Sequence, residues 1–468
     1  MPHHSIQSLL GSRWSWRCVV YALVLGWPVQ HTLAVDLIGY LPSYRMNASY
    51  NANVLPAQLK MLNEIRYFGL TAASDGSIVP QSGSGTMQAH LLNIAAIKQA
   101  IDAMPAGQRP RLNITLGGAG EDATFTNIAR TVSGVPCNLC GTFAVNVNSL
   151  LNSTGATSVD IDWEHPDAGA ERSTSYSLML QRIKEEVGAS RRVYATVDPT
   201  VVISNSVFSG PNAIDGVSLM TYDLGWWGND PGNPFQGEHS LPQYIVNSVD
   251  AWTEPAGAAN DRPWVFGTWG NNVPAGKLGI GLPFYAHEVT GAEFTPTYSQ
   301  LAATGTTTDT NYFTYQGRSV WITGPTLTEQ RVQYAKDRGL QNVIIWELGQ
   351  DLPTNNPYSL LYRAYLKNLG LSLVAGDFDA DRDVDAADYT VWRSSFGQTG
   401  FGRAADATAA DGTGNQVVDA GDYVLWRKAA AGPGSGARFD VSVPEPSAAV
   451  LVATICLIQS CRCRRRTQ

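Results

Sequence analysis

Ser158-Val159-Asp160-Ile161-Asp162-Trp163-Glu164-His165 decides the fold, because acidic and apolar residues alternate along it. Successive side chains of a β-strand point to opposite faces, so Asp160, Asp162 and Glu164 share one face. The apolar residues between them share the other face, which a packed helix would bury. An exposed acidic edge strand is the alternative, but it leaves that apolar face unexplained. Three neighbouring carboxyl groups repel one another, so we expect at least one raised pKa and an acid–base function.

The chain from residue 36 to residue 370 alternates between short apolar runs and helical segments. Each run is apolar on both faces, as parallel strands covered by helices should be. Eight such units predict an α/β fold, a (β/α)8 TIM barrel of about 250 residues with loop insertions. The expected strands are 37–41, 64–70, 111–117, 158–164, 192–197, 216–222, 278–282 and 342–346, and the expected helices include 56–63, 87–104, 171–188, 241–252, 326–338 and 357–369.

In such a barrel the chemistry lies at the carboxyl ends of the strands. We therefore expect one rim to gather side chains that are far apart in the sequence. Glu164 is expected to end the fourth strand. The other strand-end residues are Tyr40, Tyr222 with Asp223, and Trp346 with Glu347.

Composition narrows the class of protein. The 468 residues carry a net charge of −8, and only 15% of them are charged, which argues against nucleic-acid binding and fits an exported protein. The length predicts one large domain with appendages. Four of the six cysteines fall in the terminal segments, so Cys137 and Cys140 are expected to form a local disulfide in a loop.

Four motifs in order resemble glycoside hydrolase family 18, the chitinase family. Asp160-Ile161-Asp162-Trp163-Glu164 supplies the last three acids of its Asp-x-x-Asp-x-Asp-x-Glu strand, with Thr157 where the family has the first acid. Thr115-Leu116-Gly117-Gly118 resembles the family's Ser-x-Gly-Gly stretch. Met220-Thr221-Tyr222-Asp223 resembles its Met-x-Tyr-Asp stretch, and Trp346 resembles the tryptophan under the sugar ring. We expect the missing acid at Thr157 to affect the pH optimum and rate.

The resemblance implies substrate-assisted hydrolysis, in which the N-acetyl oxygen of the substrate attacks the anomeric carbon. Glu164 would be the acid and then the base. Asp162 would orient the acetamido N–H, Asp160 would share a proton with Asp162, and Tyr222 would bind the acetamido oxygen. The reaction requires no cofactor. The residues expected to contact substrate are Trp346, Asp223, Met220, Tyr40, Trp226 and Trp227.

Two further features bear on the shape of the site. Trp226 and Trp227, together with Trp269, are candidate platforms on which sugars stack, although burial under loops is an equal alternative. Residues 283–341 are short for the α+β insertion that deepens the cleft in some members of the family. We therefore expect an open, shallow groove and endo-type cutting.

The amino-terminal segment is typical of an export signal. Arg13 and Arg17 precede an apolar run, and small residues follow at Thr32 and Ala34. We assign residues 1–34 to a signal peptide and residues 35–371 to the barrel.

Two acidic loops follow the barrel, and they have the calcium-ligand spacing of an EF-hand loop. Both are followed by a Tyr-x-x-Trp-Arg sequence, and together they resemble a dockerin type I module, a small all-α repeat over residues 375–430. The resemblance implies a cohesin-like partner. The expected ligands are Asp377, Asp379, Asp381, Asp383 and Asp388 in the first loop, and Asp411, Thr413, Asn415 and Asp422 in the second.

The carboxyl-terminal segment resembles a bacterial Pro-Glu-Pro sorting signal. After a linker at 431–442, Val443-Pro444-Glu445-Pro446 precedes a short apolar run and a basic end within 443–468. We expect transient retention at the membrane and display at the cell surface.

Three other functions remain open. An endo-β-N-acetylglucosaminidase acting on N-glycans would use the same chemistry. A non-catalytic chitin-binding lectin could share the barrel, although Glu164, the acid that such lectins lose, is present. A structural surface protein built around its calcium module is the third alternative.

Overall fold

The structure is a computed structural model, which describes residues 34–166, 174–201, 203–223, 239–255, 272–289, 294–303, 311–398, 410–413 and 417–431. The predicted sorting tail and almost all of the predicted signal peptide lie outside these ranges. Within them, no helix combines the length and the apolar character that crossing a bilayer requires.

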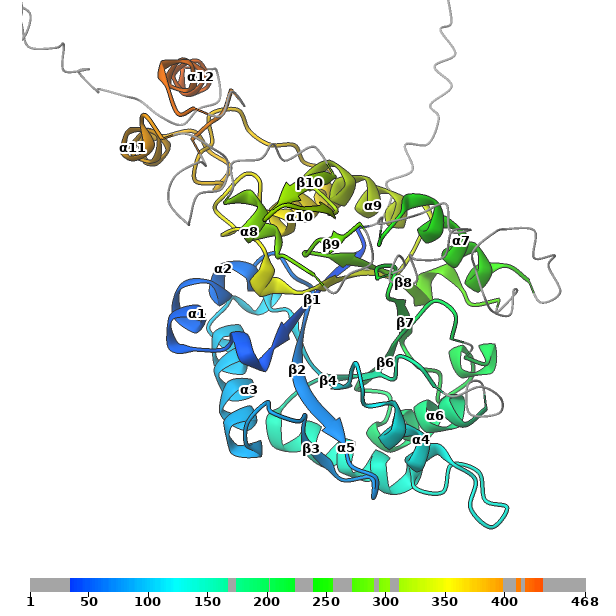
Figure 1. The fold of residues 1–468 in the computed structure, drawn as a ribbon. Coiled ribbons are helices and arrows are strands. Elements are labelled where there is room, and N and C mark those ends of the chain that lie inside the picture. Colours follow the sequence, from blue (N-terminus) through cyan, green and yellow to red (C-terminus); the bar gives the residue numbers. More distant parts are fainter. Residues whose placement is uncertain are drawn as a thin grey trace, which may run out of the picture.

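Eight parallel strands close into a barrel, and the prediction of a (β/α)8 TIM barrel is confirmed (Figure 1). Each strand pairs in parallel with the next one around the wall, and the last pairs with the first. The strands are β1 (Asp36–Pro42), β2 (Glu64–Ala72), β4 (Arg111–Gly117), β5 (Ser158–Asp162), β6 (Arg192–Val197), β7 (Gly216–Leu219), β8 (Leu278–Pro283) and β12 (Asn342–Trp346).

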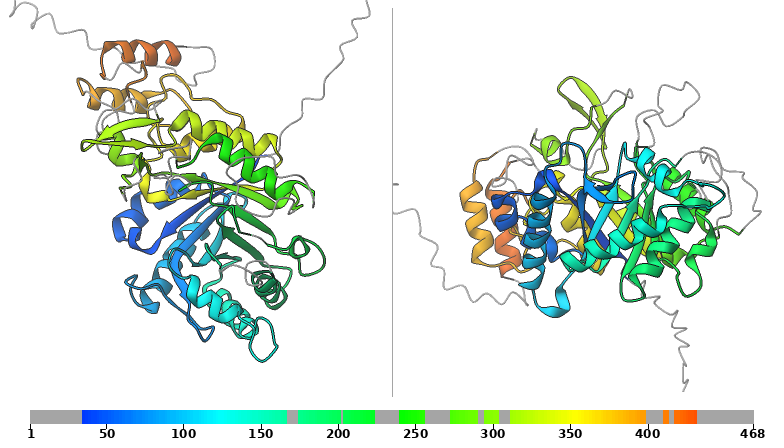
Figure 2. Two further views of the ribbon diagram at one scale, coloured as in Figure 1. Left: turned by 45° about the vertical axis from the view of Figure 1, so that its right-hand side comes forward. Right: turned by 90° about the horizontal axis from the view of Figure 1, so that it is seen from below.

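Helices surround this wall on the outside (Figures 1 and 2). After β6, however, the described residues of the connection form a 3-10 turn, Asn205–Phe208, and no α-helix. The barrel helices are α1 (Ala48–Asn53), α2 (Leu55–Leu59), α3 (Met87–Asp102), α4 (Asp122–Ala129), α5 (Cys140–Thr154), α6 (Tyr176–Val187), α7 (Pro242–Thr253), α9 (Pro325–Asp337) and α10 (Leu360–Leu369).

The strands are apolar because they are covered on both sides. Val159 and Ile161 of β5 are fully buried between the wall and the helices, as are Val343 and Ile345 of β12. Burying one such aliphatic side chain stabilises the fold by roughly 1.5–3 kcal/mol. The expected disulfide is present, between Cys137 and Cys140 just before and at the start of α5.

The segment between β8 and α9 carries a small insertion. It holds helix α8 (Tyr298–Ala302) and an antiparallel sheet of β9 (His287–Glu288), β10 (Tyr312–Tyr315) and β11 (Arg318–Trp321). The β10–β11 hairpin projects from one end of the barrel (Figure 2). A short strand, β3 (Ile78–Pro80), pairs with β2 in the antiparallel sense. The segment after β8 therefore holds both a helix and strands, and the open groove stays a prediction.

Two helices follow the barrel, α11 (Ala386–Ser395) and α12 (Ala420–Ala430), and they lie side by side outside the helical ring (Figures 1 and 2). They have their own small core, which includes Phe378, Val384, Val418 and Trp426. Tyr358, just before α10, donates a hydrogen bond to the Asp411 carbonyl oxygen at 3.4 Å.

Candidate active site

The acids of β5 face the barrel interior, as the alternation predicts. Asp160 and Asp162 are 0% and 3% exposed. Trp163, on the opposite face, is fully buried against the rings of Phe125 and Tyr176, at centroid distances of 5.8 and 5.0 Å. Glu164 does not end the strand as predicted, because β5 stops at Asp162. Its side chain is 18% exposed, so it alone of the three acids reaches solvent.

Asp160 is held by donors from several strands of the wall. The Tyr40 hydroxyl donates to Oδ2 at 2.8 Å, and the Thr115 hydroxyl donates to the same oxygen at 3.2 Å. The Thr196 hydroxyl donates to Oδ1 at 3.0 Å, and Arg66 Nη1 lies 3.0 Å from Oδ1. Asp160 is therefore a fixed anchor under the site.

Two of the acids have raised pKa values, which confirms the expectation from their spacing. Burial, followed by the charges of Glu164 and Asp160, raises the pKa of Asp162 well above its usual range. Burial, with the nearby Asp122, Asp223 and Asp198, raises the pKa of Glu164 to about 7. A carboxyl group that is still protonated near neutral pH can donate a proton.

The glycines of the Thr115-Leu116-Gly117-Gly118 motif let β4 approach the acids closely. Gly117 has φ +115°, and a Cβ atom there would collide with the Asp162 carbonyl group. Gly118 N donates to that carbonyl oxygen at 2.8 Å, and its missing side chain leaves room for the Phe68 ring. The motif therefore serves packing around β5, in addition to the Thr115 contact.

The residues after β7 lie near the acids but are not in the strand, because β7 ends at Leu219. Tyr222 is 7% exposed, and its ring occupies space that a side chain at Gly281 would fill. The Asp223 carboxylate accepts a hydrogen bond from the Tyr285 hydroxyl at 2.6 Å and lies 3.3 Å from His239 Nδ1. Met220 is half-buried at the end of β7.

Trp346 ends β12, as predicted, and is half-buried. Its ring contacts Phe68 edge-on at a centroid distance of 4.9 Å and lies 5.5 Å from the Tyr40 ring. The following peptide bond, to Glu347, is cis. Glu347 is not exposed at the rim, because its fully buried carboxylate pairs with Arg45 and accepts a hydrogen bond from Gly349 N.

Two further positional predictions, besides those for Glu164 and for Tyr222 with Asp223, were wrong. Tyr40 lies inside β1 and is only 1% exposed, so its hydroxyl supports Asp160 and does not reach the rim. Thr157 was expected to mark the loss of an inner carboxylate. It is exposed before β5 begins, and its hydroxyl bonds the Leu112 carbonyl oxygen. An odd-numbered position does not share the face of Asp160 and Asp162, so Thr157 does not touch these acids.

Sequence reasoning missed several residues of the site. Glu64 and Arg66 alternate with apolar residues on β2, and this signal was available in the sequence. His239, Tyr285 and Asp122 gave no signal, because they lie outside any motif. Trp226, Trp227 and Trp269 lie outside the described residues.

The first acidic loop brings carboxylates together around one point. Asp377, Asp379 and Asp388 form one group with oxygens within 4.8 Å of one another, and Asp383 and Asp385 form a second group with Asp388. Asp385 was not among the predicted ligands, and Asp381 belongs to neither group. Burial, with the charges of neighbouring acids, raises the pKa of Asp377 to about 7. Hard oxygen donors at this spacing, with uncompensated charge, fit a calcium ion.

The second loop repeats the geometry of the first where it is described. Asp388 accepts from Phe378 N at 2.6 Å and from Asp385 N at 2.7 Å. Asp422 likewise accepts from Thr413 N at 2.9 Å and from Asp419 N at 2.8 Å. Asp411 is buried, whereas Asn415 lies outside the described residues.

The two loop–helix units also exchange hydrogen bonds. Trp392 Nε1 donates to the Asp419 carbonyl oxygen at 2.9 Å, and Trp426 Nε1 donates to the Asp385 carbonyl oxygen at 2.9 Å. Each tryptophan of one unit thus bonds the loop of the other, and the two halves form one body.

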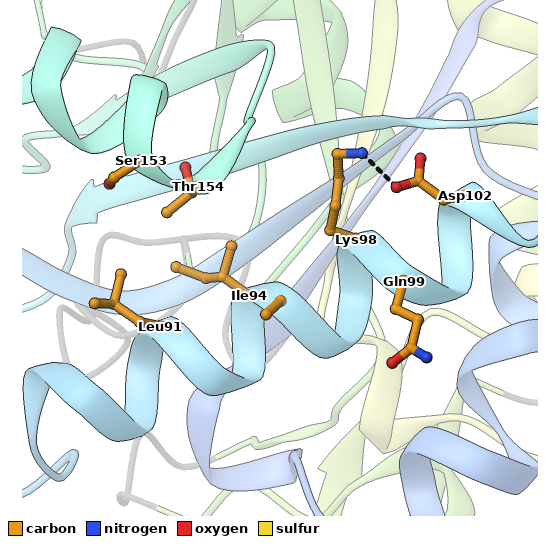
Figure 3. A pocket seen from close by; sticks show the side chains of 8 residues that line it. Leu91, Ile94, Lys98, Gln99, Asp102, Ser153 and Thr154 are labelled. Atoms are coloured by element: carbon orange, nitrogen blue, oxygen red, sulfur yellow. Dashed lines mark hydrogen bonds and ion pairs between the residues drawn. The ribbon is translucent and has the colours of Figure 1, made fainter.

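A surface hollow of about 410 Å³ lies elsewhere, between α3 and α5 on the outside of the barrel (Figure 3). Leu91 and Ile94 line it, and Lys98 pairs with Asp102 at its edge. None of the acids of β5 is among the residues that line it.

Comparisons with known proteins point to one family. Residues 38–351 match the family model described as Glycosyl hydrolases family 18. Endochitinase 1 of Metarhizium anisopliae is 22% identical over 362 residues, which cover 64% of this chain and 79% of that protein. A class V chitinase of Arabidopsis thaliana is 24% identical over 248 residues, covering 43% of this chain and 60% of that protein.

Solved structures share the fold. The GH18 chitinase ChiB of Flavobacterium johnsoniae superposes with a TM-score of 0.54 at 19% identity, covering 72% of this chain and 94% of that one. The Group IV chitinase of Ostrinia furnacalis also has a TM-score of 0.54, at 13% identity, and covers 72% of this chain and 100% of that one.

Proposed function

The chain belongs to the glycosyl hydrolases of family 18 and is a glycosidase, and from this premise we propose that it cleaves β-1,4-linked N-acetylglucosamine in chitin or chitooligosaccharides. The relatives named above are chitinases, which supports this substrate class. The observation that carries the proposal is Glu164, a solvent-reaching carboxyl group with a pKa raised to about 7 beside the buried Asp162.

The proposed reaction is substrate-assisted and retains the anomeric configuration. Glu164 donates its proton to the glycosidic oxygen while the acetamido oxygen of the substrate attacks the anomeric carbon. The leaving sugar departs with that proton, and an oxazolinium ion forms. Glu164, now a carboxylate, then takes a proton from the water that opens this ion. The raised pKa keeps Glu164 protonated in the neutral to mildly acidic range in which it must act as an acid.

The neighbouring residues have supporting parts in this proposal. Asp162 accepts the acetamido N–H and offsets the positive charge of the oxazolinium ion. Asp160 stays fixed beneath it. The Tyr222 hydroxyl binds the acetamido oxygen, Trp346 forms the floor under the sugar, and Asp223 contacts a sugar hydroxyl. No cofactor takes part.

Hydrolysis of N-acetylglucosamine oligomers, followed by NMR of fresh product, tests the proposal. We expect the β-anomer first, and we expect Glu164→Gln to lower kcat by roughly 10²–10⁴-fold because it has no proton to give. Glu185→Gln is the matched control, since Glu185 is exposed on α6 and pairs with Arg182. Wild-type activity in Glu164→Gln would exclude the acid. Turnover of N-glycans alone would favour the endo-β-N-acetylglucosaminidase alternative, and binding without turnover would favour the lectin.

We further propose that residues 375–430 form a dockerin-like module that binds calcium in both loops and docks a cohesin-like partner. The convergent carboxylates of the first loop and the repeated hydrogen bonds of Asp388 and Asp422 support calcium binding. An export signal and a sorting tail would place the enzyme outside the cell or at its surface.

A further inference from the structure

A fully buried arginine lies in the barrel beneath the acids. Arg66 is on β2, and its side chain is 0% exposed. Its Nη1 lies 3.0 Å from Asp160 Oδ1 and donates to the hydroxyls of Tyr40 at 2.8 Å and Thr196 at 2.9 Å. A buried guanidinium is stable only when it is paired, so this contact holds both partners.

Asp160 is surrounded by hydrogen-bond donors and one positive charge. Tyr40 from β1, Thr115 from β4 and Thr196 from β6 all donate hydroxyl hydrogen bonds to it. Arg66 from β2 adds the positive charge. The acid that faces Asp160 is Asp162 on its own strand. Hydrogen bonds and an opposite charge at this range stabilise a carboxylate.

Asp162 has the opposite surroundings. Among the described residues no donor reaches its buried Oδ1 atom. The negative charges of Glu164, Asp160 and, more weakly, Asp122 act on it, and the positive charge of Arg66 opposes them. Burial, followed by these charges, raises the pKa of Asp162 well above its usual range.

We propose that Arg66 is a positioning residue for the reaction: by pairing with Asp160 it keeps that carboxyl group ionised and confines the proton of the acid pair to Asp162. The inference deepens the proposed function and rests on it. The pair releases this proton to bulk water as pH rises, and Asp162 as a carboxylate can then accept the acetamido N–H. Arg66 would thus set the acidic limb of the pH profile.

Glu64 provides a test with the opposite sign. It lies on the far side of Arg66, with Oε1 3.0 Å from Arg66 Nε, and it also pairs with Arg111 at 3.0 Å. Removing the Arg66 charge makes the acid pair hold its proton more tightly. Removing the Glu64 charge leaves more of the Arg66 field on the pair, so the pair holds its proton less tightly.

The experiment compares pH profiles of kcat for the wild type, Arg66→Gln, Arg66→Lys and Glu64→Gln. We expect the acidic limb of Arg66→Gln to move to higher pH by about one unit or more, which is roughly a tenfold loss of kcat just below the wild-type limb. Arg66→Lys should bring the acidic limb most of the way back to its wild-type pH. Glu64→Gln should leave the limb in place or move it to lower pH. A merely structural role would shift Arg66→Gln and Glu64→Gln in the same direction, and that result would overturn the proposal.

A titration without substrate separates this proposal from the proposed function. In protein labelled with ¹³C at the aspartate carboxyl groups, NMR follows proton uptake by the acid pair, with Asp162→Asn giving the assignment. The pair should take up its proton at higher pH in Arg66→Gln than in wild type, and at the same or lower pH in Glu64→Gln. This holds even if no substrate is cleaved. If Arg66→Gln does not fold, Arg66→Lys and Glu64→Gln provide the test. The role is refuted if Glu64→Gln takes up the proton of the acid pair at higher pH than wild type. It is also refuted if Arg66→Lys raises that pH by more than the one unit expected for complete loss of the Arg66 charge.

Discussion

Two stretches of this chain place acids at every second residue, and they fold in opposite ways. Asp160, Asp162 and Glu164 run along β5 and into the barrel mouth, whereas Asp377 and Asp379 begin a loop ahead of α11. In the strand the acids line one face and meet side chains from other strands. In the loop they turn inward on each other, and backbone N–H groups fill the gaps.

The difference lies in what faces each acid. In the barrel, Asp160 meets Arg66 and three hydroxyls, while Asp162 meets mainly other acids. In the loop, the carboxylates of Asp377, Asp379 and Asp388 lie within reach of one cation. The same spacing of acids therefore fits proton transfer in the barrel and binding of a metal ion in the loop. The residues between the acids make the difference, because Ile161 and Trp163 continue an apolar, buried face along β5.

Neutralising one acid of the strand should give the largest effect. Asp162→Asn cannot offset the positive charge of the oxazolinium ion, so we expect kcat on N-acetylglucosamine oligomers to fall by roughly 10²–10³-fold. Asp383→Asn makes the same change at an exposed loop acid and should leave kcat unchanged. If the two variants lost kcat equally, or if neither lost kcat, the proposed difference between the strand acids and the loop acids would be wrong.

Removing calcium should affect only the loops. We expect EDTA to expose residues 377–427 to protease and to change circular dichroism there, while the barrel keeps its activity, because the two regions have separate cores. Asp388→Asn should abolish the calcium response of the first loop, since an amide cannot accept from Asp385 N with its Nδ2 atom. Asp422→Asn is the matched change in the second loop. Loops that resist protease equally with and without EDTA would argue against calcium.

Removing the charge of Asp122, near Glu164 at the barrel mouth, should give the smallest effect. Asp122 raises the pKa of Glu164, and its Oδ1 accepts from His165 N at 2.9 Å. Asp122→Asn keeps that acceptor but removes the charge, so the pKa of Glu164 should fall. Glu164 must be protonated to act, so activity is lost as pH rises through its pKa of about 7. The basic limb of the kcat profile should therefore move to lower pH in the variant. A limb that stays in place would show that Asp122 does not act on Glu164 through its charge.

The local pattern was enough to predict the barrel. All eight strands lie within a few residues of their expected positions. An apolar run bounded by turn residues is a local feature of the sequence, so it can be recognised without knowing the partners of the strand. The strand–helix alternation was not fully predicted. The described residues of the connection after β6 form a 3-10 turn and no α-helix, and the insertion after β8 holds strands that were not predicted.

Alternation is a local property of a strand, so residues 158–164 alone were enough to predict that Asp160 and Asp162 share a buried face and that Trp163 packs behind them. Which of the two acids pairs with a positive charge depends on the closed barrel. Arg66 meets Asp160 across the barrel, although 94 residues separate them, because the closed wall brings β2 and β5 to one interior. The tertiary structure also places Tyr40 below the rim and Thr157 away from the acids. Such contacts depend on how strands are staggered around the barrel, and that stagger is a property of the whole wall.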